Sequence, residues 1–548
     1  MNKTTRLRPL TRRQDPASAS RSPEDDPGKT PQQHASQAQA PSGQGQEAER
    51  GAWEERPLAP RLSENEAALR ELFCDCSDVV FRKVRVPDTE WLIVYIDGLV
   101  KTDDLHMHAL YPLLFEDPEH PDVVRSLDTV LQMGLSVSQV LEVHTLGEAV
   151  ERILSAHAVL LMDGQTKGLA LNIVNTNRRQ VAEPLSETVI RGPREGFTEV
   201  LRTNTALLRQ RIRTPNLKMV PFTIGTQTRT QVVLAYIEGL ADKKVIAEVT
   251  QRLKNIRLDA VLESGYLEEL LRDSPRSPFP QMQYSERPDT VAAQLLEGRF
   301  AVFTDGTPFV LTGPITFWQM LQSSEDYYEQ FWMSNAIRWL RFGFFLIALL
   351  LPAFYIATIT YHQDMIPTSL VLTVAAARET IPFPALIEAL IMEISFEALR
   401  EASIRLPRTV GQAVSILGAL VIGQAAVQAG IVSAPMVIVV ALTGIASFTI
   451  PKFNAAITIR MLRFPLMLLA AVLGLFGIVL GVFWIAVHLC SLRSFGVPYL
   501  AGVAPYRPGE LKDILVRAPW WHMDARPWSY AKANRRRMPD GLRPSPRR

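Results

Sequence analysis

One long uncharged stretch constrains the fold more than any other feature of the sequence. Residues 409–451 contain no Asp, Glu, Lys or Arg. An α-helix needs about 20 apolar residues to cross a bilayer once, so this stretch has room for two crossings. Gly430 and Pro435 lie near its middle, where they favour a turn between two helices. The stretch therefore predicts an integral membrane protein.

Other apolar segments extend the predicted membrane region. Further crossings are expected at residues 342–361 and 464–487, with a short uncharged piece at 365–377 and a charged helix at 382–401. Arg338 and Arg341 precede the first crossing, which by the positive-inside rule predicts a cytoplasmic N-terminal half. The basic C-terminal end also favours the cytoplasm, so an even number of crossings is expected. We predict an all-α, multi-pass transmembrane bundle over residues 334–490 and a basic cytoplasmic tail over 491–548.

The charged helix carries the candidate site. Glu393, Glu397 and Glu401 recur every four residues, so they form one stripe on a helix, and Glu388 precedes them. An acid at the bilayer centre costs about 2.5–3.5 kcal/mol, so lipid cannot face this stripe. In one interpretation Glu388, Glu393 and Glu397 line a water-filled ion path or gate. In the other, the helix lies flat at the membrane interface and its charges are solvated.

Other polar groups of the membrane region suggest pairing. Arg400 lies three residues after Glu397, and Arg405 lies four residues after Glu401. Both spacings allow an ion pair within the helix. Gln424 and Gln428 share a helix face. These two amides are candidates either for hydrogen bonds between helices or for lining the ion path.

The N-terminal half divides into a polar tail and a globular region. Residues 1–62 are rich in Arg, Gln, Pro and Ser, and are predicted to be a disordered tail. The motif YIDGL at 95–99 returns as YIEGL at 236–240, an offset of 141 residues. A strand, Asp-Gly, strand pattern at 163–164 returns at 305–306 with an offset of 142. We therefore predict an α+β cytoplasmic N-terminal domain of two related subdomains, residues 63–200 and 201–333.

The segment between these subdomains is dense in charge. Residues 183–213 contain arginines interleaved with glutamates. The arginines are candidates for binding an anion, but the neighbouring acids favour ion pairing instead.

Several function classes find no support in the sequence. The formal net charge of +2 argues against a nucleic-acid footprint. Phosphate-binding, nucleophile-elbow and zinc-protease motifs are missing, and the three cysteines lack the spacing of a zinc site. We expect no enzymatic activity, no metal and no cofactor. The cysteines are predicted to be free thiols in a reducing compartment, and no signal peptide is expected before the soluble half.

The sequence resembles a known family over residues 90–537. The membrane region, from LPAFYIATITYHQDMIP at 351–367 through FPALIEALIMEISFEALREASIRLP at 383–407, is similar to the core of GerA-type spore germination receptor A subunits. RGPREGF at 191–197, YIEGL at 236–240 and DGTPFVL at 305–311 resemble the cytoplasmic domain of the same family.

This resemblance implies a function that the residues alone do not. It implies a protein of the spore inner membrane that acts with germinant receptor B and C subunits in responding to nutrients, and that self-associates into a cation-conducting ring. Acids beside a pore favour cations, which fits the interpretation of the charged helix as an ion path. Two alternatives remain, namely an accessory protein similar to stage V sporulation protein AF, and a non-conducting scaffold that clusters receptors.

Overall fold

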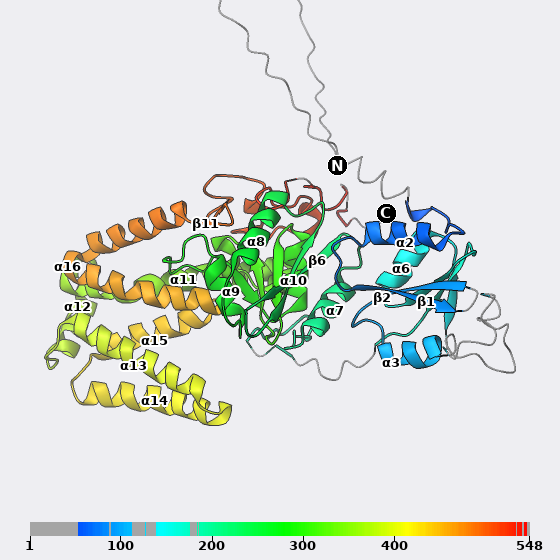
Figure 1. Cartoon of the computed structure of the whole chain (residues 1–548). Helices are drawn as coiled ribbons and strands as arrows, with labels where there is room; N and C mark the ends of the chain where they lie inside the picture. The colour runs from blue at the N-terminus through cyan, green and yellow to red at the C-terminus, as the bar shows by residue number, and fades with distance from the viewer. Residues whose placement is uncertain are drawn as a thin grey trace, which may run out of the picture. The chain divides into compact units, whose positions relative to one another are not determined.

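The computed structural model describes residues 53–86, 89–111, 127, 137, 139–175, 183–184, 186–532, 534–539 and 542–544 (Figure 1). The predicted disorder of residues 1–52 lies outside this range. The fold already includes residues 53–62, which were expected to belong to the tail. Leu58 and Leu62 are buried and Trp53 packs against the same core, because the apolar side chains of this segment contact the first sheet and its helices.

The first sheet is antiparallel and buried on both faces. Its strand order is β1-β2-β4-β5-β3. Alternate residues of the central strand β2 point to opposite faces, so Leu92 and Val94 join one core while Trp91 and Ile93 join the other. The elements are β1 (Val79–Val86), β2 (Thr89–Ile96), β3 (Val140–Val143), β4 (Ala158–Met162), β5 (Gly168–Leu171), α2 (Leu62–Leu72), α3 (Thr102–Leu105), η1 (His106–Leu110) and α6 (Leu146–Leu154).

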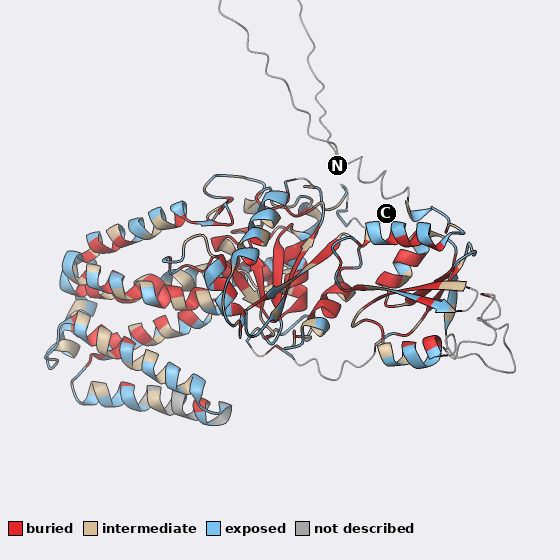
Figure 2. Ribbon diagram, viewed as in Figure 1, coloured by how far each residue is buried: buried red, intermediate tan, exposed pale blue. Residues whose placement is uncertain are grey.

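The second sheet repeats the first. Its order is β6-β7-β9-β10-β8, and Figure 2 shows its strands as largely buried. Helices α7 and α10 pack on one face, and α8 and α9 on the other. The elements are β6 (Leu217–Ile224), β7 (Thr230–Ile237), β8 (Gln283–Ser285), β9 (Phe300–Thr304), β10 (Val310–Gly313), α7 (Leu201–Arg211), α8 (Lys243–Asn255), α9 (Ser264–Leu271) and α10 (Pro288–Leu296).

The strand register reproduces the sequence repeat. The last residue of β2, Ile96, pairs with the first of β1, and Ile237 at the end of β7 pairs in the same way with the first residue of β6. Gly98 and Gly239 follow these strands with φ of +83° and +80°. This left-handed conformation strains other residues, which explains the glycine in both motifs. The expected relationship between the two halves is therefore present in the topology.

A buried ion pair joins the two halves. Both Nε and Nη2 of Arg209 on α7 donate to the Asp78 carboxylate, each at 2.8 Å, and both residues are buried. In the segment between the subdomains, Arg211 donates to Glu195 at 2.8 Å. The pairing interpretation of these arginines is confirmed, although Arg209 uses an acid that lies far away in the sequence.

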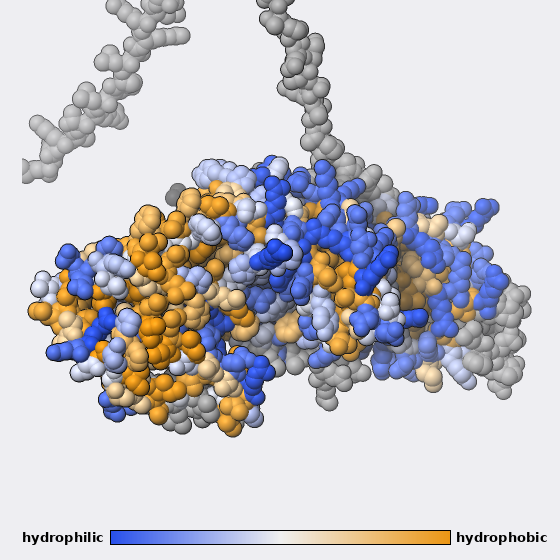
Figure 3. Space-filling model, turned by 60° about the vertical axis from the view of Figure 1, so that its left-hand side comes forward, coloured by the Kyte–Doolittle hydropathy of each residue, from blue (hydrophilic) through white to orange (hydrophobic). Residues whose placement is uncertain are grey.

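Helices form most of residues 331–491, and apolar side chains cover much of their outer surface (Figure 3). Two of them, α11 and α16, are long and apolar enough to cross a bilayer. The helices are α11 (Phe331–Thr360), α12 (Thr368–Arg378), α13 (Ala385–Arg405), α14 (Arg408–Gln428), α15 (Ala434–Phe448) and α16 (Phe453–Ser491). Short 3-10 turns flank them, namely η3 (Phe317–Leu321), η4 (Ser324–Tyr327) and η5 (Gln363–Met365).

Helix α16 is a hairpin of two antiparallel helices (Figure 1). Gly474 interrupts it with φ +62° and ψ −142°, and a methyl group on Gly477 would overlap the carbonyl oxygen of Leu469. At the other end of the hairpin, Thr458 and His488 contact the neighbouring residues Pro278 and Ser277. The single helix predicted over residues 464–487 is therefore wrong, because a glycine in a left-handed conformation reverses the chain within it.

The C-terminal segment is folded rather than being a basic tail. It contains β11 (Arg493–Ser494), β12 (Val497–Pro498), η6 (Leu511–Asp513) and η7 (Trp520–His522). Ser494 Oγ accepts from the Ile315 amide at 3.1 Å, and the buried Tyr499 hydroxyl donates to the Pro280 carbonyl at 2.6 Å. The basic tail predicted over residues 491–548 is folded from 493 to 532, because Phe495 packs in the core of the second sheet and Val497, Ala501 and Tyr530 form a small core of their own.

Candidate functional site

The first acid of α13, Glu388, is buried against the N-terminus of α15. Glu388 Oε1 lies 3.0 Å from Arg378 Nη2, at the end of α12. Its Oε2 accepts from the backbone N–H of Ser433 at 3.0 Å and from the Ser433 hydroxyl at 2.8 Å. Ser433 is the N-cap of α15, and a carboxylate is favourable there because the helix dipole is positive at its N-terminus. Glu388 therefore ties three helices together.

The second acid forms a buried ion pair with α16. Arg463 Nη1 donates to Glu393 Oε2, and each residue is only 2% exposed. Glu393 Oε1 and two nitrogens of Arg463 have no hydrogen-bond partner within the described part of the chain. Two charges in a low-dielectric interior attract each other strongly, but separating them is unfavourable because each would remain desolvated. The pair therefore locks α13 against the first half of α16.

The next acids show the pairing that the helical spacing predicts. Arg400 donates to Glu397, and Arg405 Nε donates to Glu401 at 2.9 Å. Arg460 Nε, one turn before Arg463 on α16, lies 3.9 Å from Glu397. The stripe thus runs from buried acids to a solvated pair, and its buried half resembles neither a solvated interfacial helix nor an open path.

Gln424 and Gln428 are not brought to the acids in the single chain. Both are exposed on α14, whereas Gly423 on the same helix is buried and faces Val437 of α15. Helix α14 packs mainly on α13, where Gly418 meets Leu399. The two amides therefore lie on a face of α14 that no described part of the chain covers.

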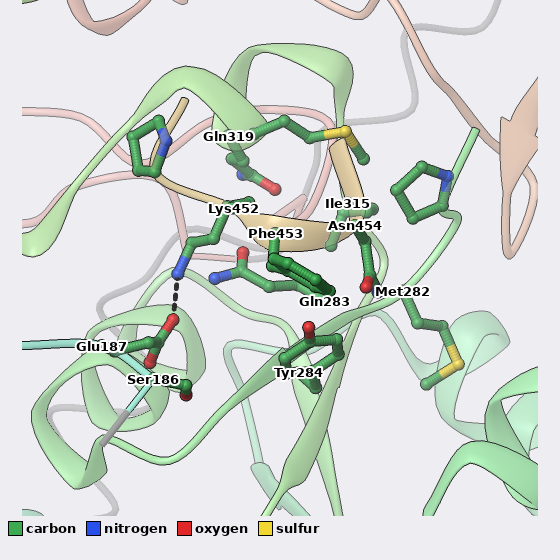
Figure 4. Close-up of a pocket in the computed structure, with 13 residues that line it drawn as sticks. Ser186, Glu187, Met282, Gln283, Tyr284, Ile315, Gln319, Lys452, Phe453 and Asn454 are labelled. Carbon is green, nitrogen blue, oxygen red and sulfur yellow. Dashed lines mark hydrogen bonds and ion pairs between the residues drawn. The ribbon is translucent and has the colours of Figure 1, made fainter. Parts of the chain in front are cut away.

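An ion pair connects the α15–α16 turn to the segment between the subdomains. Lys452 Nζ donates to Glu187 Oε1 at 2.6 Å, and the Ser285 hydroxyl donates to the other oxygen of Glu187 at 2.5 Å. Figure 4 shows this pair at the edge of a small pocket whose wall includes Phe453 and Tyr284. Because Glu187 belongs to the segment between the subdomains, this pair links that segment to the helices.

A second cluster fixes the start of α11. Asp326, in η4, accepts from Arg338 at 3.3 Å and from Arg341 at 3.0 Å, and all three residues are buried. Asp513, in the C-terminal segment, accepts from Arg338 at 3.1 Å and from the Tyr327 hydroxyl at 2.7 Å. Burial raises the pKa of Asp513, with Arg338 opposing it. The arginines that predict membrane orientation are therefore structural anchors as well.

Sequence reasoning missed the partners that come from far along the chain. Arg463 lies 70 residues from Glu393, and Lys452 lies 265 residues from Glu187. The available signal was charge: Lys452, Arg460 and Arg463 are basic residues at the start of a long apolar segment, which suggests acids nearby. Within the described residues, no group of three or more His, Cys, Asp or Glu side chains could hold a metal.

Comparisons with known proteins identify the family of the chain. Residues 67–529 match the Bacillus/Clostridium GerA spore germination protein family. The spore germination protein KA of Bacillus subtilis (strain 168) is 45% identical, over 90% of this chain and 91% of its own length. Spore germination protein A1 of the same organism is 42% identical, over 84% of this chain and 92% of its own. An uncharacterized membrane protein there, YfkQ, is 60% identical over 88% of this chain and 93% of its own.

A solved structure is also similar. The N-terminal domain of the A subunit of the Bacillus megaterium spore germinant receptor GerK3 is 33% identical, covering 48% of this chain and 97% of that chain, with a TM-score of 0.35. The family match extends over most of the chain, from the first sheet to the folded C-terminal segment. The chain belongs to the GerA spore germination protein family.

Proposed function

We propose that this chain is the A subunit of a nutrient-responsive spore germinant receptor, and that several copies assemble into a gated cation channel in the spore inner membrane. Family membership and relatives named spore germination proteins support the receptor role. Germinant receptor B and C subunits are the proposed partners. In this proposal the chain is not an enzyme and needs no metal or cofactor.

We also propose a topology of six crossings. The crossings are α11, α13, α14, α15 and the two halves of α16, while α12 stays on the side away from the sheets. The C-terminal segment packs on the second sheet, so both ends of the helical part lie on one side, which requires an even number of crossings. Arg338 and Arg341 support a cytoplasmic position for that side.

The observation that carries the channel proposal is the buried Glu393–Arg463 pair. It places an acid inside an apolar helical bundle, where charged residues are costly and therefore usually mark a functional site. With Glu388 and Glu397 also held by arginines, this conformation corresponds to a closed state. A movement of α13 away from α16 would expose Glu393, and a negative ring contributed by several copies would favour cations. Gln424 and Gln428 would then lie at the contact between copies or along the path.

A non-conducting scaffold is the second candidate. Each acid of α13 has an arginine partner within the single chain, so none is left free to attract an ion in this conformation. A receptor-clustering role would need only the exposed helix faces.

Potassium release from nutrient-triggered spores tests the channel. Spores would carry the wild-type chain or the variants Glu388→Gln, Glu393→Gln and Glu397→Gln at matched protein levels, with the B and C subunits present. Glu401→Gln is the matched control, because Glu401 is exposed on the same helix. The proposal predicts slower or less selective release in the three variants only. Release at wild-type rate in all of them would favour the scaffold.

A further inference from the structure

A second, larger cavity lies beside the pocket of Figure 4 and shares Ser186, Glu187, Lys452 and Phe453 with it. Its volume is about 430 Å³, which is in the size range of small-molecule sites. The segment between the subdomains, the start of α10 and η4 form one wall. Helices α11 and α13 and the α15–α16 turn form the other. The cavity is therefore located where the sheets meet the helices.

Cationic side chains dominate the charged groups in its wall. The five cations are Arg287, Arg341, Arg400, Lys452 and Arg460. Among the described lining residues only two carboxylates oppose them, Glu187 and Glu325. Hydroxyl groups that can donate hydrogen bonds complete the wall, including those of Thr188, Thr290 and Ser324.

Three of the cations each have a carboxylate partner that no other lining cation shares. Arg287 Nη2 donates to Asp289 at 2.8 Å. Arg341 is held by Asp326, as described above, and Lys452 is held by Glu187. These pairs fix the wall of the cavity and contribute little net charge to it. The remaining charged groups of the wall are Arg400, Arg460 and the carboxylate of Glu325, which accepts from the backbone N–H of Ile190 at 2.5 Å.

Arg400 and Arg460 share a single carboxylate. Glu397 accepts from Arg400 and lies 3.9 Å from Arg460 Nε, so two guanidinium groups face one negative charge. Arg400 Nη1 is buried and has no hydrogen-bond partner within the described residues. Phe453, the first residue of α16, lines the same wall, and the free N–H groups at the start of a helix favour anions.

We propose that this cavity binds a phosphate-class anion, either a soluble phosphate or the phosphodiester headgroup of an anionic lipid. Guanidinium groups match phosphate oxygens in geometry and charge. The spare donor of Arg400 and the excess charge of Arg460 would be satisfied, and hydroxyl groups would bind the remaining oxygens. The site adjoins the proposed ion path, because Arg400 and Arg460 hold Glu397, but anion binding does not require conduction.

Such a ligand would connect the two walls of the cavity. It would contact α13 and α16 on one side, and the segment that links the subdomains on the other. Binding to the folded state alone stabilises it in proportion to ligand concentration, so bound anion would hold the sheets and the helices in the present arrangement.

The test uses the purified full-length protein in detergent. Inorganic phosphate is titrated against chloride at matched ionic strength, and thermal unfolding and affinity are measured. The double variant Arg400→Gln/Arg460→Gln is expected to weaken phosphate binding by about tenfold or more. Arg405→Gln is the matched control, because Arg405 lies on the same helix and is exposed. The comparison between variants is needed because phosphate also stabilises proteins by exclusion from their surface.

A second arm identifies the source of the anion. The same proteins are placed in nanodiscs of phosphatidylcholine with or without phosphatidylglycerol. Stabilisation by phosphatidylglycerol alone, lost in the double variant, assigns a lipid headgroup, whereas a phosphate effect in detergent assigns a soluble anion. Thr188→Asp adds a negative charge to the wall without removing an arginine, and it should also abolish binding if the double variant does not fold. Equal responses of the wild type, Thr188→Asp and Arg405→Gln to both probes would overturn the proposal.

Discussion

Breaking the Glu393–Arg463 pair should be among the most destabilising single changes in the helical part. Each residue is 2% exposed, so Glu393→Gln leaves an uncompensated buried guanidinium. Loss of one partner of a buried pair costs about 3–5 kcal/mol. The pair Glu401–Arg405 is the internal comparison, since its side chains are 62% and 77% exposed. An exposed pair contributes about 1 kcal/mol or less.

A double-mutant cycle measures this difference. The full-length protein in detergent is unfolded with denaturant, and the wild type is compared with Glu393→Met, Arg463→Met and the variant that carries both. Replacing both partners by apolar residues of similar size is often neutral or stabilising, so the double variant should recover most of the stability that either single variant loses. The reasoning would be refuted if the two single-variant losses in the free energy of unfolding added up in the double variant. It would also be refuted if Glu393→Gln lowered that free energy no more than Glu401→Gln does.

Three further predictions concern other parts of the fold. Gly474→Ala should lower stability by about 1–2 kcal/mol, because φ of +62° is unfavourable for residues with a Cβ; thermal unfolding in detergent would show it, and an unchanged midpoint would argue against the hairpin turn. Cys76 should react with a thiol reagent at least about tenfold more slowly than the exposed Cys74. Burial raises the pKa of the Cys76 thiol, so less thiolate is present at any pH below that pKa, and equal rates would contradict its position. Asp78→Asn should lower the free energy of unfolding by about 3–5 kcal/mol, because Arg209 would remain buried without a carboxylate partner. Denaturant unfolding of the protein measures this loss.

Local patterns in the sequence predicted local structure well. The repeated YIDGL and YIEGL motifs predict related subdomains, because a buried strand followed by a left-handed glycine is a geometric requirement that two copies share. The spacing of Glu397 and Arg400 predicts their pairing, because neighbouring turns of a helix bring such residues together. These predictions depend only on residues close in sequence.

Contacts between distant segments could not be predicted in the same way. Periodicity shows that Glu393 needs a partner, but many arginines in the chain could supply it, and only the packing of α13 on α16 selects Arg463. The α16 hairpin was missed because a glycine in an apolar helix of a membrane protein is common. The fold of the C-terminal segment was not predicted because basic residues dominate its composition. The few apolar residues that become buried, such as Tyr499, show no regular spacing among them.

Ion selectivity of the reconstituted protein tests the central claim most directly. The purified chain, assembled with its B and C subunits in a planar bilayer, would be studied under a potassium chloride gradient. The reversal potential would be measured for the wild type, for Glu393→Gln and for the control Glu401→Gln. The account predicts a cation-selective reversal potential that moves toward zero in Glu393→Gln and remains in Glu401→Gln. No conductance from the wild-type assembly, or selectivity that is the same with and without Glu393, would contradict it.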